Sequence, residues 1–311
     1  MYTYDRRTID AAGAFLIGEL ERLDQTLNLP LSSVTWQRDI DLREDVTMTD
    51  ETSSFTVSNF AAAGGTSPTG KNFIGKDTTV IPGIALDIGK IPSPLHLWAL
   101  ELGWTILELE AAQKVGRPID SQKYEGMQLK YNMDVDAMVY LGDTEVGAVG
   151  LINHPSIAVG NSTLNWATAT PKQILDDVND LLSTVWAATA YSVMPDQLRL
   201  PPAKMARLTQ PVTEAGSTSL LEYISKQCLT YAETGKALDI KSLKWLVGRG
   251  AAGKDRVLAY NRDKKYVRYP LVPMRSTPLE FRGLYQLIVY YCKLGHVEFV
   301  YPETLGYMDG N

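Results

Sequence analysis

The sequence has few cysteines and no long apolar run, the features needed for disulfides, cysteine metal sites or a membrane span. Among 311 residues there are only two cysteines, Cys228 and Cys292. Two are too few for a disulfide framework or a cysteine-built metal site, so we expect two buried free thiols. The chain has no run of about 18 apolar residues and no charged-then-apolar leader. We therefore expect a soluble, unprocessed, intracellular product.

Basic charge is also scarce. The net charge is −6, with acidic and basic residues interspersed. A protein that binds nucleic acid tightly needs a face rich in lysine and arginine to neutralise phosphates. The acidic net charge therefore argues against such a function.

Histidines and catalytic motifs are nearly absent. The three histidines, His96, His154 and His296, lie far apart in the chain, without Glu-x-x-His or His-x-x-x-His spacing. A metal site or a histidine relay could still assemble in space, but the spacing does not indicate one. No Gly-x-Ser-x-Gly elbow occurs either. We predict no catalytic residues, no cofactor-binding residues and no metal ligands, and hence no enzyme.

Two glycine-lysine segments come close to a phosphate-binding loop. They are Gly65 to Lys71 followed by Asn72, and Gly248 to Lys254 followed by Asp255. The loop needs a hydroxyl after the lysine and must join a strand to a helix. Neither segment has the hydroxyl, and the second runs into a strand-like stretch. We interpret both as glycine-rich turns.

The first ninety residues divide into a helix and an extended stretch. The first 25 or so residues predict an amphipathic helix that Pro30 ends. Residues 31–92 carry little core-forming periodicity, which leaves two interpretations. One is a disordered insert. The other is a long β-hairpin that projects from the body and packs on another chain, which the alternation of Ile84, Leu86 and Ile88 favours.

Helix signals become regular after residue 100. Thr105 and Glu108 form a capping box for a helix that stops at Gly116. Asp120 is predicted to cap a long amphipathic helix, and Thr170 with Pro171 starts a third. A fourth is predicted over about 219–233, capped by Ser219. The apolar face of the long helix is predicted to consist of Tyr124, Met127, Tyr131, Val135 and Met138.

The end of the chain is rich in strand-forming residues. Two runs of aromatic and branched residues flank Gly295, and the second ends in a polar Asp309-Gly310-Asn311 tip. This pattern is typical of a half-buried antiparallel ladder, and it closes the chain on a strand. Because helices and strands mix without βαβ regularity, the predicted fold class is α+β.

A charged cluster lies near residue 40. Its members are Asp39, Asp41, Arg43, Glu44 and Asp45. A solvated face and charge pairing with a neighbouring subunit both fit this pattern, and the sequence does not separate them.

Several blocks, taken in order, resemble one known family. They are Glu108-Leu-Glu-Ala-Ala, Gly116-Arg-Pro-Ile-Asp120, Tyr140-Leu-Gly-Asp143, Gly150-Leu-Ile-Asn153, Thr170 to Asp177, Leu200-Pro-Pro202, Arg256 to Asn261 and Gly295 to Pro302. Their order from about residue 105 to the end is similar to that in the major capsid proteins of tailed bacteriophages. That family has the Hong Kong 97-type capsid fold and is related to the encapsulins.

The resemblance implies a domain organisation. It implies an N-terminal arm at 1–35, an extended loop at 36–97, and a peripheral domain at 98–168 whose spine helix starts at Asp120. An axial domain at 169–265 follows, and strands at 266–311 return to the peripheral domain. Some relatives cross-link covalently through such loops, but Lys71 and Lys76 are expected to be merely solvated.

The resemblance also implies a function. The chain would be a structural major capsid protein, assembled in the host cytoplasm into hexamers and pentamers of an icosahedral virion shell around double-stranded DNA. Its partners would be copies of itself, scaffolding and portal proteins, decoration or cement proteins, and DNA held by weak nonspecific contact. No membrane is involved. The alternatives are an encapsulin-like nanocompartment shell and, from another class, a nucleotide-binding enzyme built on a glycine-lysine loop.

Overall fold

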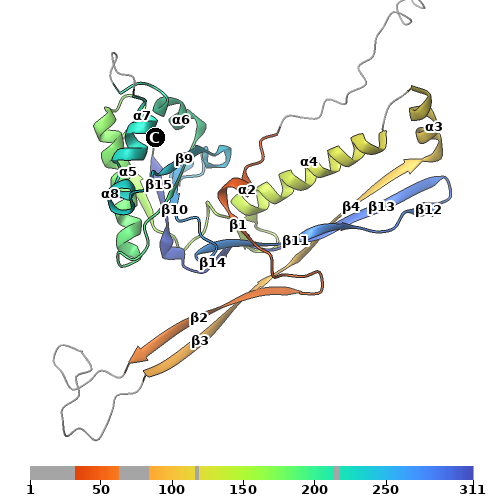
Figure 1. Ribbon diagram of the computed structural model, residues 1–311, viewed down its shortest axis with the longest axis horizontal. Helices are drawn as coiled ribbons and strands as arrows, with labels where there is room; N and C mark the ends of the chain where they lie inside the picture. Colours follow the sequence, from red (N-terminus) through yellow and green to blue (C-terminus); the bar gives the residue numbers. More distant parts are fainter. Residues whose placement is uncertain (1–31, 63–83, 116–118, 213–217, 311) are drawn as a thin grey trace, which may run out of the picture. The chain divides into compact units, whose positions relative to one another are not determined.

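The computed structural model describes residues 32–62, 84–115, 119–212 and 218–310. They form a mixed α+β fold, as predicted (Figure 1). Contacts divide the chain into two compact units. The smaller unit includes Leu100–Tyr131 and Ser276–Val289, and the larger one Val34–Ala99, Asn132–Arg275 and Tyr290–Asn311. The predicted N-terminal helix lies outside the described residues. Within the described part, no helix is long and apolar enough to cross a membrane.

A five-stranded sheet, in the order β7-β15-β10-β8-β9, forms the centre of the larger unit. Its strands are β7 (Val159–Ser162), β15 (Leu305–Gly310), β10 (Asp255–Tyr260), β8 (Gln197–Leu200) and β9 (Asp239–Ser242). The strand β15 is antiparallel to β10 and parallel to β7, and all its residues are buried. The polar tip predicted at Asp309 and Gly310 is therefore wrong, because both residues belong to this internal strand.

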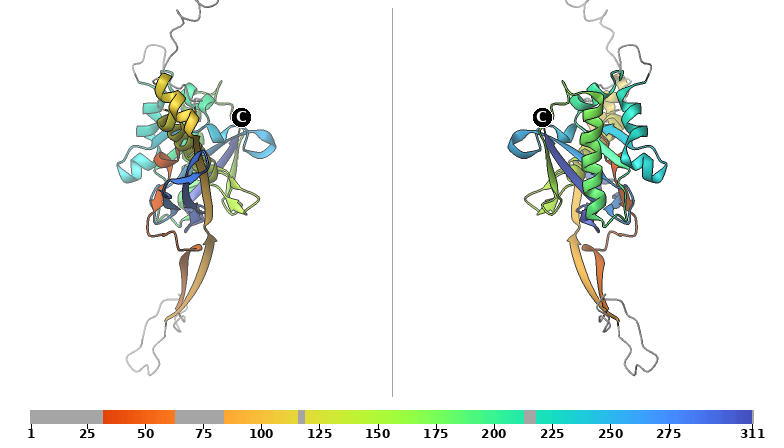
Figure 2. Two further views of the ribbon diagram at one scale, coloured as in Figure 1. Left: turned by 90° about the vertical axis from the view of Figure 1, so that its right-hand side faces the viewer. Right: turned by 90° about the vertical axis from the view of Figure 1, so that its left-hand side faces the viewer.

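The helix α5 (Pro171–Ala188) packs on this sheet; it is the long green helix in the right-hand view of Figure 2. The predicted capping box is confirmed: the Gln173 amide N–H donates to the Thr170 hydroxyl, and the Thr170 amide N–H donates to the Gln173 side chain. Residues at helical spacing fill the core. A Cβ atom at Gly306 would clash with Val185, so α5 lies directly on the β15 backbone. The buried residues of α5 are Ile174, Val178, Leu181, Leu182 and Val185.

The predicted fourth helix is two helices, α7 (Leu220–Gln227) and α8 (Leu229–Thr234). Cys228, between them, has an extended backbone. Its N–H donates to the Ile224 carbonyl, which is the last helical hydrogen bond of α7. The next amide, Leu229 N–H, donates instead to the Asn179 side chain of α5. This tertiary bond replaces a helical one, so the single-helix prediction is wrong. The predicted cap at Ser219 is confirmed by its bond from the Glu222 amide.

A second sheet has six strands, with the path β1-β11-β13-β12 and with β14 and β4 joined to β11 and β13. Its strands are β1 (Asp41–Arg43), β4 (His96–Thr105), β11 (Val267–Ser276), β12 (Glu280–Arg282), β13 (Tyr285–Leu294) and β14 (Glu298–Phe299). The two runs that flank Gly295 thus do not pair with each other. The 3₁₀ turn η3 (Pro302–Thr304) precedes β15, which joins the other sheet. The predicted ladder is corrected in this respect, although the last described element is a strand.

Of two further helices, one confirms its predicted start signal and the other does not. The helix α3 (Ile106–Val115) has the predicted capping box, in which Thr105 and Glu108 exchange side-chain and amide bonds. The helix α4 (Ile119–Tyr140) includes Asp120 as its second residue, so Asp120 is not its cap. Of the predicted apolar face, Met127 and Val135 are buried and the others are half-buried.

The remaining elements are short. They are α2 (Trp36–Asp39), β5 (Gly142–Asp143), β6 (Ala148–Val149), α6 (Pro202–Leu208), η1 (Lys244–Leu246) and η2 (Ala251–Gly253).

A long two-stranded hairpin completes the larger unit. The strands β2 (Thr52–Ala62) and β3 (Ile84–Pro94) pair antiparallel over their full length. For the described residues 52–62 and 84–94, the structure thus confirms a β-hairpin in place of a disordered insert. Packing of the hairpin on another chain stays a prediction.

Candidate assembly surfaces

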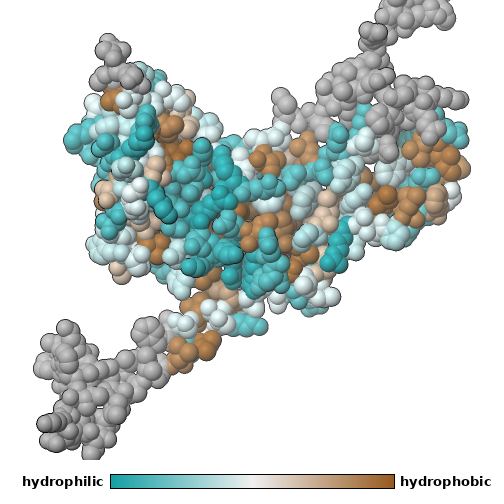
Figure 3. Space-filling model, viewed as in Figure 1, coloured by the Kyte–Doolittle hydropathy of each residue, from teal (hydrophilic) through white to brown (hydrophobic). Residues whose placement is uncertain are grey.

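The hairpin exposes apolar side chains that its own chain does not cover. Leu86 and Ile88 of β3 are 62% and 61% exposed. Alternation along a strand puts both on one face and Ile91 on the other. Figure 3 shows apolar surface along the described part of the hairpin. A two-stranded ribbon with an uncovered apolar face is marginal alone and needs a partner surface.

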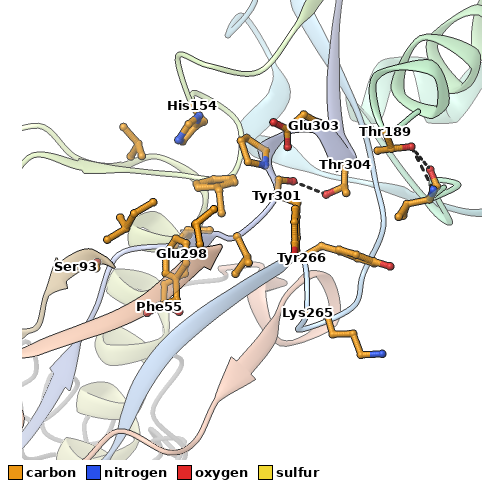
Figure 4. Close-up of a pocket in the computed structure, with 18 of the residues that line it drawn as sticks. Phe55, Ser93, His154, Thr189, Lys265, Tyr266, Glu298, Tyr301, Glu303 and Thr304 are labelled. Atoms are coloured by element: carbon orange, nitrogen blue, oxygen red, sulfur yellow. Dashed lines mark hydrogen bonds between the residues drawn. The ribbon is translucent and has the colours of Figure 1, made fainter. Parts of the chain in front are cut away.

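The other face of the hairpin borders an open cleft of about 1220 Å³ (Figure 4). Phe55 and Ile91, opposite each other in the β2–β3 register, contribute apolar surface to it. The body contributes Tyr266, Tyr301 and residues that follow α5. This wall is large and mainly apolar, which suits a polypeptide surface.

The root of the hairpin is fixed to the body by a buried carboxylate. Glu298 of β14 accepts hydrogen bonds from Arg43, Arg268 and the hydroxyl of Ser53. Arg43 also donates to the Ser54 carbonyl at 3.0 Å, so its guanidinium joins β2 to β14. Glu298 is buried and has two cationic partners, so its role is to hold the hairpin root to the body.

A histidine pair lies on the β3 side of this root. The Nε2 atoms of His96 and His296 are 2.9 Å apart, while the ring centroids are 5.0 Å apart and the planes differ by 17°. The rings therefore meet through their Nε2 edges. Burial first, and then the charge of His96, lower the pKa of His296. Residues two hundred positions apart thus form a contact that the sequence spacing did not reveal.

The third histidine does not join this pair. His154 lies in a loop, as predicted, and its ring packs against Phe299 with centroids 4.3 Å apart. Burial lowers the pKa of His154. Both His154 and His296 line the cleft. Among the described residues, no group of three or more histidine, cysteine, aspartate or glutamate side chains could hold a metal ion.

The charged cluster near residue 40 pairs within its own chain. Asp39 is fully buried and accepts hydrogen bonds from Arg38, Arg199 and Tyr140. Burial opposes its ionisation, but the bonds from Arg38 and the charge of Arg199 outweigh this, and the pKa of Asp39 lies below its ordinary value. Neither interpretation offered by the sequence is right for Asp39.

Other members of the cluster behave similarly. Asp41 pairs with Arg262 at 2.9 Å, and Arg43 with Asp45 at 2.6 Å and with Glu298. Only Glu44 and Asp45 are exposed, as a solvated face requires.

The described glycine-lysine loop is built around carboxylates. The Gly248 amide donates to Asp255, and the Ala251 amide donates to Asp309. The loop leads into β10 and not into a helix. Amides that would bind a phosphate are therefore already bonded to negative groups, which supports the interpretation as a turn. The first such loop, Gly65 to Lys71, lies outside the described residues, as do Lys71 and Lys76.

The two cysteines are buried and unpaired, as predicted. Burial raises the pKa of Cys292 to about 12, which keeps the thiol protonated and unreactive.

The smaller unit has exposed apolar side chains of its own. They surround the turn between β12 and β13, where Phe281 is 65% exposed. Figure 3 shows apolar surface over this part as well. The group, here called the β12–β13 patch, consists of Leu279, Phe281, Leu284 and Tyr285.

Comparison with known proteins identifies the family. A family model described as major capsid protein matches residues 70–310. The chain belongs to the major capsid protein family. Its role is structural and not enzymatic, and this capsid protein is a component of a virion shell. Since a shell contains many copies of its major protein, further copies of the chain are among its partners. No curated protein matches the sequence.

Solved structures show the same fold at low sequence identity. The capsid of Myoviridae phage XM1 matches with a TM-score of 0.77 at 16% identity, covering 94% of this chain and 98% of that one. The capsid of a native GTA particle matches with a TM-score of 0.65 at 11% identity, covering 97% and 98%. A virus-like particle from Pyrococcus furiosus matches with a TM-score of 0.52 at 13% identity, covering 88% and 92%. The capsid protein therefore has the Hong Kong 97-like capsid fold over nearly its full length.

The exposed apolar strip of this capsid protein was easier to predict from the sequence than the buried polar groups at the hairpin root. The alternation of Leu86 and Ile88 was a usable signal for the exposed strip. No sequence signal predicted the buried groups at the hairpin root, Glu298 and the His96–His296 pair. The pattern around a polar residue in a strand does not indicate which distant residue it contacts.

Proposed function

We propose that the chain forms the hexamers and pentamers of an icosahedral phage head that encloses double-stranded DNA. The family assignment supports a shell, and the extended hairpin supports assembly through surfaces shared between copies. A closed shell needs the same contact repeated at every subunit, so each contact can be modest.

The observation that carries the proposal is the exposed apolar strip, Leu86 and Ile88 on β3. Complete burial of a leucine or isoleucine side chain contributes about 1.5–3 kcal/mol. Both are more than half exposed, so covering them with a second copy would add about 2–4 kcal/mol to each contact. This free energy of burial is large when the contact is repeated at every subunit of a shell. It contributes little to the folding of one subunit, in which both side chains stay exposed.

The test replaces both side chains, Leu86→Ser with Ile88→Ser, and examines the products by electron microscopy after co-expression with the scaffolding protein. We expect few or no shells and an unchanged thermal unfolding midpoint. The matched control is Val247→Ser, an exposed apolar residue outside the hairpin, and it should assemble normally. Normal shell yield from the double variant would contradict the proposal.

A deletion gives an independent test of the hairpin. Removing about residues 62–73 should leave a folded body that assembles poorly. Ordinary thermal stability together with normal shell yield would count against an intersubunit role.

The proposal includes the domain boundaries given by the family resemblance. The extended loop at 36–97 would contain β2 and β3, and the peripheral domain at 98–168 would contain α3 and α4 as spine helix. The axial domain at 169–265 would contain α5 to α8 with β8 to β10. The arm at 1–35 and the return strands at 266–311 complete the division, except that β15, at the end of the last segment, pairs in the sheet that holds β8 to β10.

A nanocompartment shell is the second candidate, favoured by the likeness to the Pyrococcus furiosus particle. Such a shell would enclose protein cargo. Extraction of native particles decides between the two: nucleic acid inside supports the phage head, and protein cargo without nucleic acid supports the compartment.

Contact with DNA is proposed to be weak. A chain with net charge −6 has little basic surplus to neutralise phosphates. In a mobility-shift titration at physiological salt we expect weak binding of duplex DNA, no sequence preference and a shallow salt dependence. A tight, sequence-selective complex would refute this. Scaffolding, portal and decoration proteins are the other partners that we propose, without assigned surfaces.

A further inference from the structure

The His96–His296 pair stands where the hairpin meets the body. His96 begins β4, one residue after Leu95, which itself follows the last residue of β3. His296 follows Gly295, whose amide donates to the Pro270 carbonyl at 3.0 Å. A Cβ atom at Gly295 would clash with Pro270 and approach Leu95. The pair therefore joins the continuing hairpin strand to a tightly packed turn of the body.

The geometry allows one proton between the rings and excludes two. At 2.9 Å one Nε2–H can donate to the lone pair of the other Nε2. This requires one ring to carry its proton on Nε2 and the other on Nδ1. One added proton is accommodated, since a charged ring can donate to a neutral one. A second added proton places two N–H groups head to head and two like charges in contact.

We infer that this pair is a proton-binding site that releases the hairpin root when both rings become protonated. Both side chains are half-buried, so protons can reach them while solvent screens their repulsion incompletely. The inference about the root stands without the proposed function. Only its consequence for shells depends on that function.

Among the described residues, the acidic side chain next to the pair in sequence is Glu298, and it does not offset the second charge. Glu298, two residues after His296, is already bonded to Arg43 and Arg268. On β13, Lys293 donates to the Asp50 carbonyl, and His154 packs on Phe299 across the cleft. Burial and the charge of His96 are the causes that lower the pKa of His296. Because the folded pKa of His296 lies below its unfolded value, folding carries no penalty at high pH. The penalty appears as pH falls through the unfolded pKa and is complete below the folded one.

The test is hydrogen exchange of the full-length, unassembled subunit in chelator-containing buffer at about pH 7.5 and about pH 5, within the range where histidine titrates. After correction for intrinsic exchange, we expect the protection of peptides covering 93–98 and 294–298 to fall by about tenfold or more at the lower pH, which corresponds to about 1.4 kcal/mol. Peptides of β10 should keep their protection.

Three variants make the result specific. His296→Gln and His96→Gln each remove one ring of the pair and keep a hydrogen-bonding group. Without two like charges in contact, the acid response at the root should be smaller than in the wild type in both variants, and the part caused by burial of His296 should remain in His96→Gln. His154→Asn, the control in the same cleft, should respond like the wild type. An unchanged root in the wild type at low pH overturns the inference. So does a full response in both glutamine variants, or loss of the response in His154→Asn.

Shells provide the second readout. If the subunit responds but assembled shells do not change at about pH 5, a partner surface holds the hairpin and the pair does not govern the shell. Failure of the subunit to assemble at all bears on the proposed function alone.

Discussion

The hairpin and the five-stranded sheet, both in the larger unit, use apolar residues in opposite ways. In β15 all six residues are buried, between two neighbouring strands and beneath α5. In β3 the residues from Leu86 to Pro92 are all exposed. In the described part of the chain, the strand β15 pairs along both edges, with β7 and β10, whereas β3 pairs along one edge only, with β2. The sheet is covered within one chain, whereas the hairpin has exposed apolar side chains that its own chain does not cover.

The largest expected effect breaks the buried ion cluster beside the sheet. Asp39→Asn removes the buried carboxylate partner of Arg199, which is also fully buried, and leaves it only the partly exposed Asp239. Removing one member of a buried pair costs about 3–5 kcal/mol. We expect a corresponding loss in the free energy of unfolding measured by denaturant titration. The exposed Asp45→Asn is the control and should lose less than about 1 kcal/mol, the usual upper value for a surface pair. Equal losses would show that burial does not set the strength of these pairs.

A matched pair of truncations tests the comparison most directly. Leu182→Ala removes a fully buried side chain from α5 and should destabilise the subunit by about 2–5 kcal/mol. Leu86→Ala removes the same atoms from the hairpin and should change subunit stability by less than about 0.5 kcal/mol. Shell assembly should respond in the reverse way for folded protein, with Leu86→Ala reducing the yield. A large stability loss from Leu86→Ala would mean that the hairpin is packed within its own chain.

Acid should weaken the sheet at a lower pH than it weakens the hairpin root. Burial opposes ionisation of Asp309, but bonds from Arg256 and the Ala251 amide keep the pKa of Asp309 below its ordinary value, as for Asp39. Each carboxylate therefore contributes stability that is present above the unfolded pKa of about 4 and is lost as pH falls through the folded pKa. Thermal unfolding midpoints should fall steeply below about pH 4. In Asp309→Asn the midpoint should be lower near neutral pH and depend less on acid. An unchanged acid slope would exclude Asp309 as a source of this dependence.

The smallest expected effect concerns a helix start. Thr170→Ala removes the hydroxyl that accepts from the Gln173 amide and should cost about 1 kcal/mol. Thr170→Ser keeps the hydroxyl and should retain most of the stability. The same loss in both variants would show that the threonine methyl group, and not the cap, is responsible.

Local signals predicted the elements, and long-range contacts decided what the sequence could not show. Capping residues placed the starts of α3 and α5, because a cap depends on neighbours three positions away. Cys228 broke a predicted helix because Asn179, fifty residues earlier, binds the next amide. Asp309 was predicted to lie in a polar tip because the sequence does not show its partner. That partner is Arg256, which lies on another strand.

The functional surface follows the same division. The strip of Leu86 and Ile88 was visible as alternation, a property of a few consecutive residues. The root needed Arg43, Arg268 and Glu298 to meet, and no spacing rule brings these together. The exposed apolar strip was therefore predictable from the sequence, and the polar groups that fix the hairpin to the body were not.

The position of β15 has a consequence for synthesis. Of the five strands in its sheet it is the last to be translated, yet it lies between β7 and β10. Until Leu305–Gly310 is available, β7 and β10 each lack a neighbour, and the face of α5 that contacts Gly306 has no cover. Unpaired strand edges and bare apolar surface are what chaperones and proteases recognise in nascent chains. A chain that stops before Leu305 should therefore expose the edge of β7 and the apolar face of α5 that β15 covers in the complete subunit.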